Sequence, residues 1–177
     1  APALTLRAGH RAIEHIRHNG LQPQDVHMIP GAAGGPKALG IQGLDLALFG
    51  EWLPRAPQPR SLIGASIGSW RFASACMPDP VTTLRQLGEL YTNMRFPKGV
   101  SIQRISAACG EMLDELLGGE FDTILTNPNY YLNIVVVKSL GLLQHDSRTR
   151  LGLGLSGVIG ANLLGRRHLG RFFERVI

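Results

Sequence analysis

Two glycine-rich segments of the chain hold residue types that could perform acyl transfer. The first, residues 64–68, reads Gly-Ala-Ser-Ile-Gly and matches the G-x-S-x-G pattern. The second, residues 30–37, reads Pro-Gly-Ala-Ala-Gly-Gly-Pro-Lys. A serine hydroxyl presented on a sharp strand-to-helix turn acts as a nucleophile, and backbone amides at a second turn can stabilise the oxyanion that its attack creates.

The neighbours of Ser66 are those that such a turn requires. An apolar run at residues 61–63 predicts a short strand before the serine, and residues 67–77 predict a helix after it. The turn between them is so tight that the positions two before and two after the nucleophile must lack bulk. Gly64 and Gly68 meet this demand, and the amide of Ile67, next to the nucleophile, is one expected oxyanion donor.

The upstream glycine segment predicts the other donors. It follows the apolar run 26–29 and precedes residues 38–52, which are apolar at helical spacing. Pro36 has no N–H, so we expect the donors among Gly34, Gly35 and Lys37, with the proline in the first helical turn. The Lys37 side chain fits two interpretations, a loop anchor or headgroup contact and an ordinary solvated lysine.

Phosphate-binding patterns do not fit this segment. A P-loop requires G-x-x-x-x-G-K-[ST], whereas Gly35 is followed by Pro36, Lys37 and Ala38. The dinucleotide pattern G-x-G-x-x-G is also missing from Gly31 onward. Either glycine motif alone also fits a loop that merely packs. The two motifs together, in one strand-loop-helix-strand-turn-helix unit, favour acyl chemistry.

These motifs resemble the patatin-like phospholipases, serine acyl hydrolases that use a Ser–Asp dyad. The resemblance covers roughly residues 26–80, and it implies a three-layer α/β/α fold with a mostly parallel central sheet. It places the nucleophile on Ser66 and the oxyanion loop on Gly34, Gly35 and Lys37. Ala38 stands where the family usually has glycine. The implied activity is hydrolysis of a lipid or other ester through an acyl-enzyme, without a cofactor or a metal.

The third motif of that family, an Asp-Gly pair supplying the general base, does not occur. None of the six aspartates precedes a glycine: Asp25, Asp45, Asp79, Asp114, Asp122 and Asp146. The chain also stops in an apolar segment, residues 169–177, which indicates a truncated sequence and not a natural C-terminus. We therefore expect the catalytic aspartate beyond Ile177, and residues 1–177 to be most of a single patatin-like domain lacking its C-terminal part.

Three alternatives stay open. An acyltransferase would use the same serine and pass the acyl group to an alcohol or thiol. A catalytically silent domain that binds lipid or a partner would explain the missing base. An ordinary α/β-hydrolase would need a histidine after Ser66, and only His145 and His168 follow it in the chain.

The remaining segments predict alternating helices and strands, as in an α/β fold. Residues 8–19, 80–94 and 101–117 read as helices, and the β-branched run 133–137 reads as a strand buried on both faces. The glycines of residues 151–164 fit either a closely packed helix or loops. Trp70 has both a substrate-side and a packing interpretation. Asn127, Asn129 and Asn133 read as a loop before the strong strand that could border the substrate.

Composition limits the partners. The chain carries a formal net charge of +5, with arginines clustered near its end, at Arg166, Arg167, Arg171 and Arg175. Without interleaved aromatic residues or zinc-ligand spacing, this cluster does not predict nucleic-acid binding, and peripheral contact with an anionic lipid surface fits better.

Cys76 and Cys109 have no C-x-x-C spacing and read as buried free thiols. No membrane-spanning segment or signal pattern is apparent, so we expect a cytoplasmic location. Because the first residue is not methionine, the sequence is also compatible with a signal peptide that has been removed. The sequence leaves the oligomeric state open.

Overall fold

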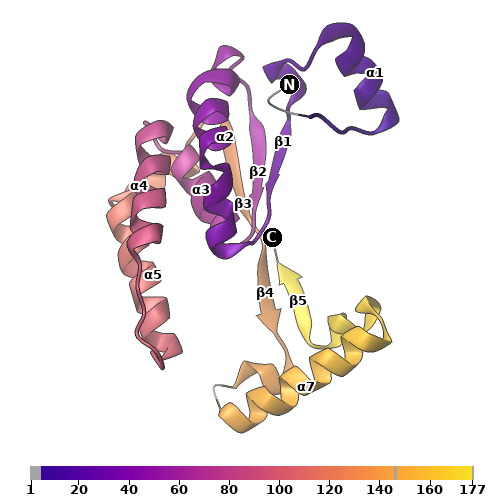
Figure 1. The fold of residues 1–177 in the computed structure, drawn as a ribbon, viewed down its shortest axis with the longest axis vertical. Coiled ribbons are helices and arrows are strands. Elements are labelled where there is room, and N and C mark those ends of the chain that lie inside the picture. The colour runs from indigo at the N-terminus through magenta and orange to yellow at the C-terminus, as the bar shows by residue number, and fades with distance from the viewer. Residues whose placement is uncertain (1–4, 146, 177) are drawn as a thin grey trace. The chain divides into compact units, whose positions relative to one another are not determined.

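The computed structural model describes residues 5–145 and 147–176 (Figure 1). Its α-helices are α1 (His10–Asn19), α2 (Gln42–Ala47), α3 (Ile67–Ala75), α4 (Pro80–Asn93), α5 (Ile102–Leu117), α6 (Phe121–Leu125) and α7 (Arg148–Leu164). Its strands are β1 (Met28–Gly31), β2 (Arg60–Gly64), β3 (Tyr130–Ile134), β4 (Val136–Ser139) and β5 (Phe173–Val176). Short 3₁₀ or π turns are η1 (Pro23–Asp25), η2 (Gly35–Ile41), η3 (Leu48–Trp52), η4 (Leu53–Arg55), η5 (Gly141–Gln144) and η6 (Arg166–Arg171).

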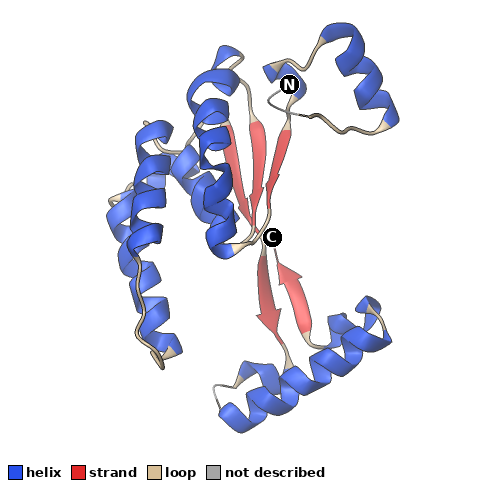
Figure 2. Ribbon diagram, viewed as in Figure 1, coloured by secondary structure: helices blue, strands red, loops and turns tan. Residues whose placement is uncertain are grey.

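The chain divides into two compact units, Ala1–Leu132 and Asn133–Ile177, called here the N-terminal and C-terminal units. The N-terminal unit is built on a three-stranded parallel sheet in the order β1-β2-β3 (Figure 2). The C-terminal unit holds the antiparallel pair β4-β5. The predicted α/β class is thereby confirmed. The layering, the patatin-like topology and the single-domain organisation stay predictions.

The core of the N-terminal unit lies where α3 and the segment before β2 meet the sheet. Phe49 packs edge-on against Phe72 and Tyr130, with ring centroids 6.1 and 5.6 Å apart. Leu62 in β2 and Leu53 are fully buried beside them. Aromatic rings in this arrangement bury large apolar areas and pack in specific geometry, so they hold β2, β3 and α3 in fixed positions.

Arg60 stabilises the beginning of β2 from inside the protein. Its side chain is 1% exposed, and its guanidinium donates to the carbonyls of Val26, Pro23 and Ala56 at 2.9, 3.0 and 2.8 Å. A buried cation is tolerated only when its donors are satisfied. Arg60 therefore ties the chain before β1 to the chain before β2.

Four helices predicted from the sequence are present with the expected ends. Each begins and ends within two residues of the predicted bounds: α1, the helix after the serine (α3), α4 and α5. Asp79 caps α4 by accepting from the Thr82 amide at 3.0 Å, and Ser101 caps α5 by accepting from the Arg104 amide at 3.2 Å. Gly118 ends α5 in the left-handed conformation, as a C-terminal glycine commonly does.

The helix expected over residues 38–52 is a composite. It runs from the 3₁₀ turn η2 through the short α2 into the π turn η3. Gly40, Gly43 and Gly50 weaken a regular helix here. Gly50 also lies so close to α4 that an added Cβ would approach Val81 Cγ2 to 2.4 Å. Close packing against α4 therefore determines the path of this segment.

The prediction of one doubly buried strand over residues 133–137 is wrong. The run is divided at Val135 between β3 of the parallel sheet and β4 of the antiparallel pair. Ile134, Val136 and Val137 are 46, 48 and 58% exposed. β-Branched residues favour extended backbone, but this preference does not specify which sheet a strand joins or how deeply it is buried.

Residues 151–164 belong to a single helix, α7, which resolves the ambiguity left by their glycines. Added Cβ atoms at Gly154 and Gly157 would approach Leu143 to 2.7 Å and Phe172 to 3.1 Å, whereas Gly152 and Gly160 have nothing within 4 Å. Gly154 and Gly157 therefore let α7 pack closely on η5 and on the segment before β5.

Candidate active site

The two predicted motifs lie side by side at one edge of the parallel sheet. Gly31 at the end of β1 pairs with Gly64 at the end of β2. Beyond this pair, the Ala65 amide donates to the Gly31 carbonyl at 3.0 Å. The carboxyl ends of parallel strands are where α/β proteins place their ligands. The glycine loop 32–34 and the turn around Ser66 both begin at this edge (Figure 2).

Ser66 has a strained backbone. Its φ and ψ are 53° and −128°, and among residues 5–145 and 147–176 it is the only non-glycine residue with a positive φ. The residue is exposed, and its carbonyl accepts the Ser69 amide at 2.8 Å at the start of α3. Strain of this kind persists only where the surrounding structure enforces it, and it is concentrated at functional sites. A nucleophile elbow likewise places its serine on a sharp, strained turn between a strand and a helix.

The two glycines around Ser66 enforce this turn because no side chain fits at either position. A Cβ added to Gly64 would lie 2.6 Å from the Cα and N of Ser69. One added to Gly68 would lie 2.3 Å from the Gly31 carbonyl oxygen. α3 therefore crosses the ends of β1 and β2 in direct backbone contact, and the steric role predicted for both glycines is present.

Some backbone amides of the glycine loop have no backbone acceptor. Pro36 occupies the first turn of η2, where its missing N–H costs nothing. The amides of Gly34, Gly35 and Ile67 have no backbone acceptor in the described part of the chain, whereas the Lys37 amide donates to the Gly34 carbonyl at 3.3 Å. This leaves three unpaired amides next to the turn.

A buried ion pair joins the helices that follow the two loops. Arg71 in α3 donates through Nε and Nη2 to Asp45 Oδ2 and Oδ1 in α2, at 2.6 and 2.5 Å. The two side chains are 9 and 4% exposed. Bidentate pairing fixes orientation as well as distance, so the pair locks the helix after the glycine loop to the helix after Ser66.

Sequence reasoning missed this pair and also missed Tyr91. Asp45 and Arg71 are 26 residues apart, and no local spacing connects them. Tyr91 of α4 packs edge-on against Trp70, with ring centroids 5.9 Å apart, and its hydroxyl would lie 3.7 Å from a Cβ on Gly35. The packing interpretation of Trp70 is therefore present in the structure, and the aromatic pair borders the glycine loop.

No described side chain hydrogen-bonds to the Ser66 hydroxyl. Asp45 is committed to Arg71, and Asp79 caps α4. Asp25 accepts from the Gln22 amide at 2.8 Å and lies 3.1 Å from His15. These contacts lower the pKa of Asp25, with the Gln22 amide the largest cause, and the Thr82 amide lowers the pKa of Asp79. These three carboxylates are thus occupied in local structural roles, and Asp146 lies outside the described residues.

The polar residues after α6 also have structural roles. The Asn127 side chain donates to the Cys76 carbonyl at 2.8 Å and accepts from the amides of Asn129 and Tyr130, both at 2.9 Å. It therefore fixes the beginning of β3. Asn133, expected in a loop, lies in β3. Burial raises the pKa of the Cys76 thiol to about 12, whereas Cys109 is only half-buried, and both are free.

Within the described residues, no group of three or more His, Cys, Asp or Glu side chains is placed to hold a metal ion. No helix in the same residues has the length and apolar character needed to cross a bilayer.

Comparisons of the chain with protein-family models, with curated proteins and with solved structures found no match.

Proposed function

We propose that this chain carries the nucleophile and oxyanion loop of a serine ester hydrolase with a three-layer, patatin-like α/β fold. The observation that supports this most is the strained backbone of Ser66 between two glycines that admit no side chain. A packing turn would not need a serine at φ 53°, because glycine adopts that conformation without strain. The nearby unpaired amides supply the second requirement of acyl transfer.

In the proposed reaction, Ser66 Oγ attacks the carbonyl carbon of an ester, such as a lipid acyl ester, and transfers its proton to a carboxylate base. The amides of Gly34, Gly35 and Ile67 donate to the resulting oxyanion, and loss of one such donor typically costs about 3 kcal/mol of transition-state stabilisation. Collapse of the tetrahedral intermediate releases the alcohol, which takes the proton. Water then attacks the acyl-enzyme and releases the acid. Transfer to another alcohol or a thiol would use the same intermediate.

A second candidate is a catalytically silent domain that binds lipid or a protein partner. One observation favours it: no side chain in the described part of the chain hydrogen-bonds to the Ser66 hydroxyl. The catalytic proposal instead requires a base such as the aspartate expected after Ile177. The two candidates therefore differ in whether Ser66 can be activated.

Labelling with a fluorophosphonate separates them. We expect a chain continued past Ile177 to be labelled, Ser66→Ala to abolish the labelling, and the 177-residue chain to react weakly. Ser69→Ala is the matched control, because this neighbouring serine is 5% exposed and its hydroxyl has no partner in the described part of the protein. A folded, continued chain that resists labelling would refute the catalytic proposal and support the silent domain.

A further inference from the structure

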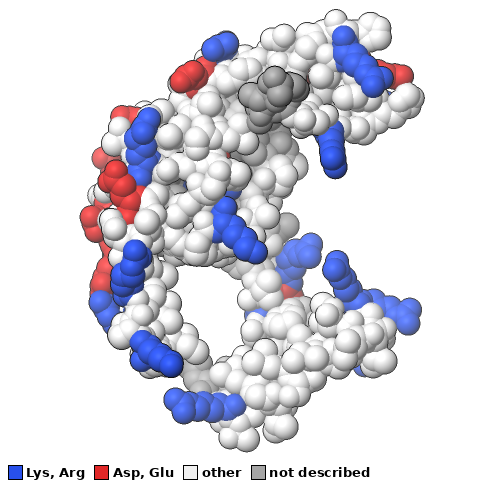
Figure 3. All heavy atoms as spheres, viewed as in Figure 1, with Lys and Arg blue, Asp and Glu red and all other residues white. Residues whose placement is uncertain are grey.

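The C-terminal unit carries the whole net charge of the protein. Residues 133–177 hold seven Lys or Arg and two Asp or Glu, a net charge of +5, whereas residues 1–132 hold eleven of each sign. The visible acidic side chains in Figure 3 lie mainly over the N-terminal unit, with most of them along α4 and α5. A basic unit attached to a neutral one indicates a partner with negative charge.

The same unit exposes more apolar side chains than its size predicts. Ten of the 19 exposed large apolar residues among the described ones lie in it, and five of these are on α7: Leu153, Leu155, Ile159, Leu163 and Leu164. Leu163 and Leu164 are 83 and 79% exposed. Exposed apolar residues gathered on one element, and not scattered singly, mark an interaction surface.

The two sides of α7 differ in what covers them. The side with Gly154 and Gly157 packs on Leu143 and Phe172. Leu155, Ile159 and Leu163 follow one another at intervals of four residues, so they form a stripe along the helix, and all three are more than half exposed. This stripe, called here the α7 stripe, has no cover within the unit.

Arginines stand at both ends of the stripe. Arg148 and Arg150 lie in the first turn of α7, and Arg166 and Arg167 follow its last residue. In Figure 3, the surface at the place of α7 is mostly uncharged and is bordered by cationic side chains. Cations that flank apolar side chains suit an anionic lipid surface, because the cations meet the headgroup phosphates while the apolar groups enter the acyl region.

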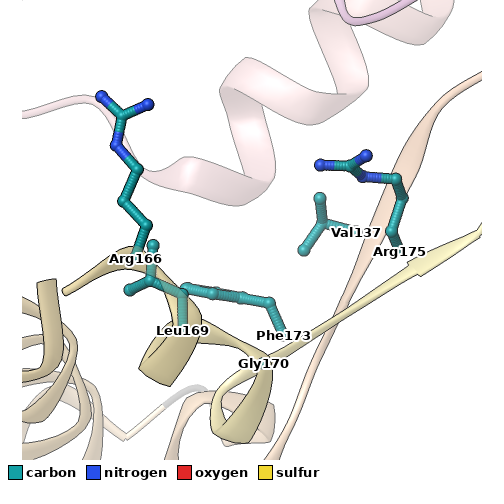
Figure 4. A pocket seen from close by; sticks show the side chains of 6 residues that line it. All are labelled: Val137, Arg166, Leu169, Gly170, Phe173 and Arg175. Carbon is teal, nitrogen blue, oxygen red and sulfur yellow. The ribbon is translucent and has the colours of Figure 1, made fainter.

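A cavity in the same unit also combines cationic and apolar side chains. It measures about 670 Å³ and is lined by Val137, Arg166, Leu169, Gly170, Phe173 and Arg175. Figure 4 shows the guanidinium groups of Arg166 and Arg175 at its sides and the apolar side chains of Leu169, Phe173 and Val137 between them. Guanidinium groups recognise phosphate, and the apolar side chains between them suit a hydrocarbon chain.

We propose that the C-terminal unit docks the protein on an anionic phospholipid bilayer, with the α7 stripe in the interface and the arginines on lipid phosphates. A nucleic acid would match the charge but leave the stripe in water. An uncharged hydrophobic protein partner would match the stripe but not the seven cations. The surface of an anionic bilayer satisfies both, and it requires no helix that spans it.

The first test is flotation of the 177-residue chain with vesicles. Vesicles of phosphatidylcholine alone are compared with vesicles containing about 30% phosphatidylglycerol. We expect binding to the anionic vesicles, weakened by raised salt because exposed charges are screened. Equal binding to both vesicle types, or binding to neither, would overturn the proposal.

Paired variants then test each contribution. Arg166→Gln with Arg167→Gln removes two cations, each worth about fivefold in partitioning, so we expect a loss of about 25-fold. Ile159→Gln with Leu163→Gln keeps good helix formers and should cost about tenfold or more. The matched controls in the N-terminal unit are Arg85→Gln with Lys98→Gln, and the 80% exposed Leu125→Gln. Controls that lose as much binding as the test variants would contradict docking through the C-terminal unit.

This docking is independent of the proposed catalysis. Ser66→Ala is expected to keep full vesicle binding while losing fluorophosphonate labelling, so either proposal can fail alone. Sedimentation without lipid gives the remaining check. If the protein forms a dimer that the stripe variants dissociate, the stripe is an interface between copies and the lipid proposal is wrong.

Discussion

The two units use their apolar residues in opposite ways. Of the 16 buried apolar residues found in the described chain, 15 lie in the N-terminal unit, and the C-terminal unit contributes Leu143. The N-terminal unit is neutral, while the C-terminal unit carries +5. The comparison shows that apolar content alone does not indicate a core.

Rigidity and exposure suit different tasks. The glycine loop and the Ser66 turn need fixed geometry, and a dense core with a buried ion pair supplies it. A surface that meets lipid headgroups needs exposed apolar and cationic groups, and no precise geometry. The division of the chain thus separates a proposed reaction site from a proposed docking surface.

The largest difference in stability between the two units is expected when an ion pair is broken in each of them. Asp45→Ala leaves Arg71 charged and buried, and breaking such a pair costs about 3–5 kcal/mol. Glu174→Ala removes a partner of Lys138 in a pair at 3.5 Å whose side chains are both more than half exposed, and such pairs contribute less than about 1 kcal/mol.

Both tryptophans, Trp52 and Trp70, lie in the N-terminal unit, so urea unfolding followed by tryptophan fluorescence measures the Asp45 effect. Hydrogen exchange of the α7 amides follows the C-terminal unit. Asp45→Leu with Arg71→Met should recover most of the loss, since no charge remains buried. A double variant as unstable as Asp45→Ala would show that the pair does not act through its charges.

A glycine-to-alanine substitution is expected to change the stability of each unit by a smaller amount. The sign of this change should differ between the two units. Gly68→Ala forces a Cβ against the Gly31 carbonyl, and overpacking of this kind costs about 1–3 kcal/mol. Gly160→Ala in α7 meets nothing within 4 Å and should stabilise the helix by about 0.5–1 kcal/mol. Fluorescence-detected unfolding and α7 hydrogen exchange measure the two changes. Equal effects would show that packing around Gly68 is looser than its contacts indicate.

Local rules were sufficient for the features that depend on neighbouring residues. Ser66, Gly64 and Gly68 could be placed on a strand-to-helix turn because the steric demand of that turn is local. The caps of α4 and α5 and the C-terminal Gly118 follow the same logic.

Features set by distant contacts could not be predicted in this way. The Asp45–Arg71 pair depends on how α2 and α3 cross, and the break at Val135 depends on which sheet receives each half of an apolar run. Hydrophobic periodicity gives the type of an element but not its partners. The exposure of the α7 stripe has the same origin, since the sequence of α7 is apolar on all sides and only its packing shows which side is covered.

The smallest expected difference concerns the N-caps. Asp79 accepts the Thr82 amide in α4, whereas Ser147 before α7 makes no side-chain cap bond, so Asp79→Ala should destabilise its helix and Ser147→Ala should change little. The Thr82 amide lowers the pKa of Asp79 in the folded state, so the ionised carboxylate stabilises the fold above its ordinary pKa of about 4. This contribution is lost as the pH falls through the lowered pKa. Unfolding midpoints of Asp79→Ala and the unaltered protein should therefore differ at pH 7 and converge in acid, whereas a difference that persists in acid would assign the effect to something other than the charge.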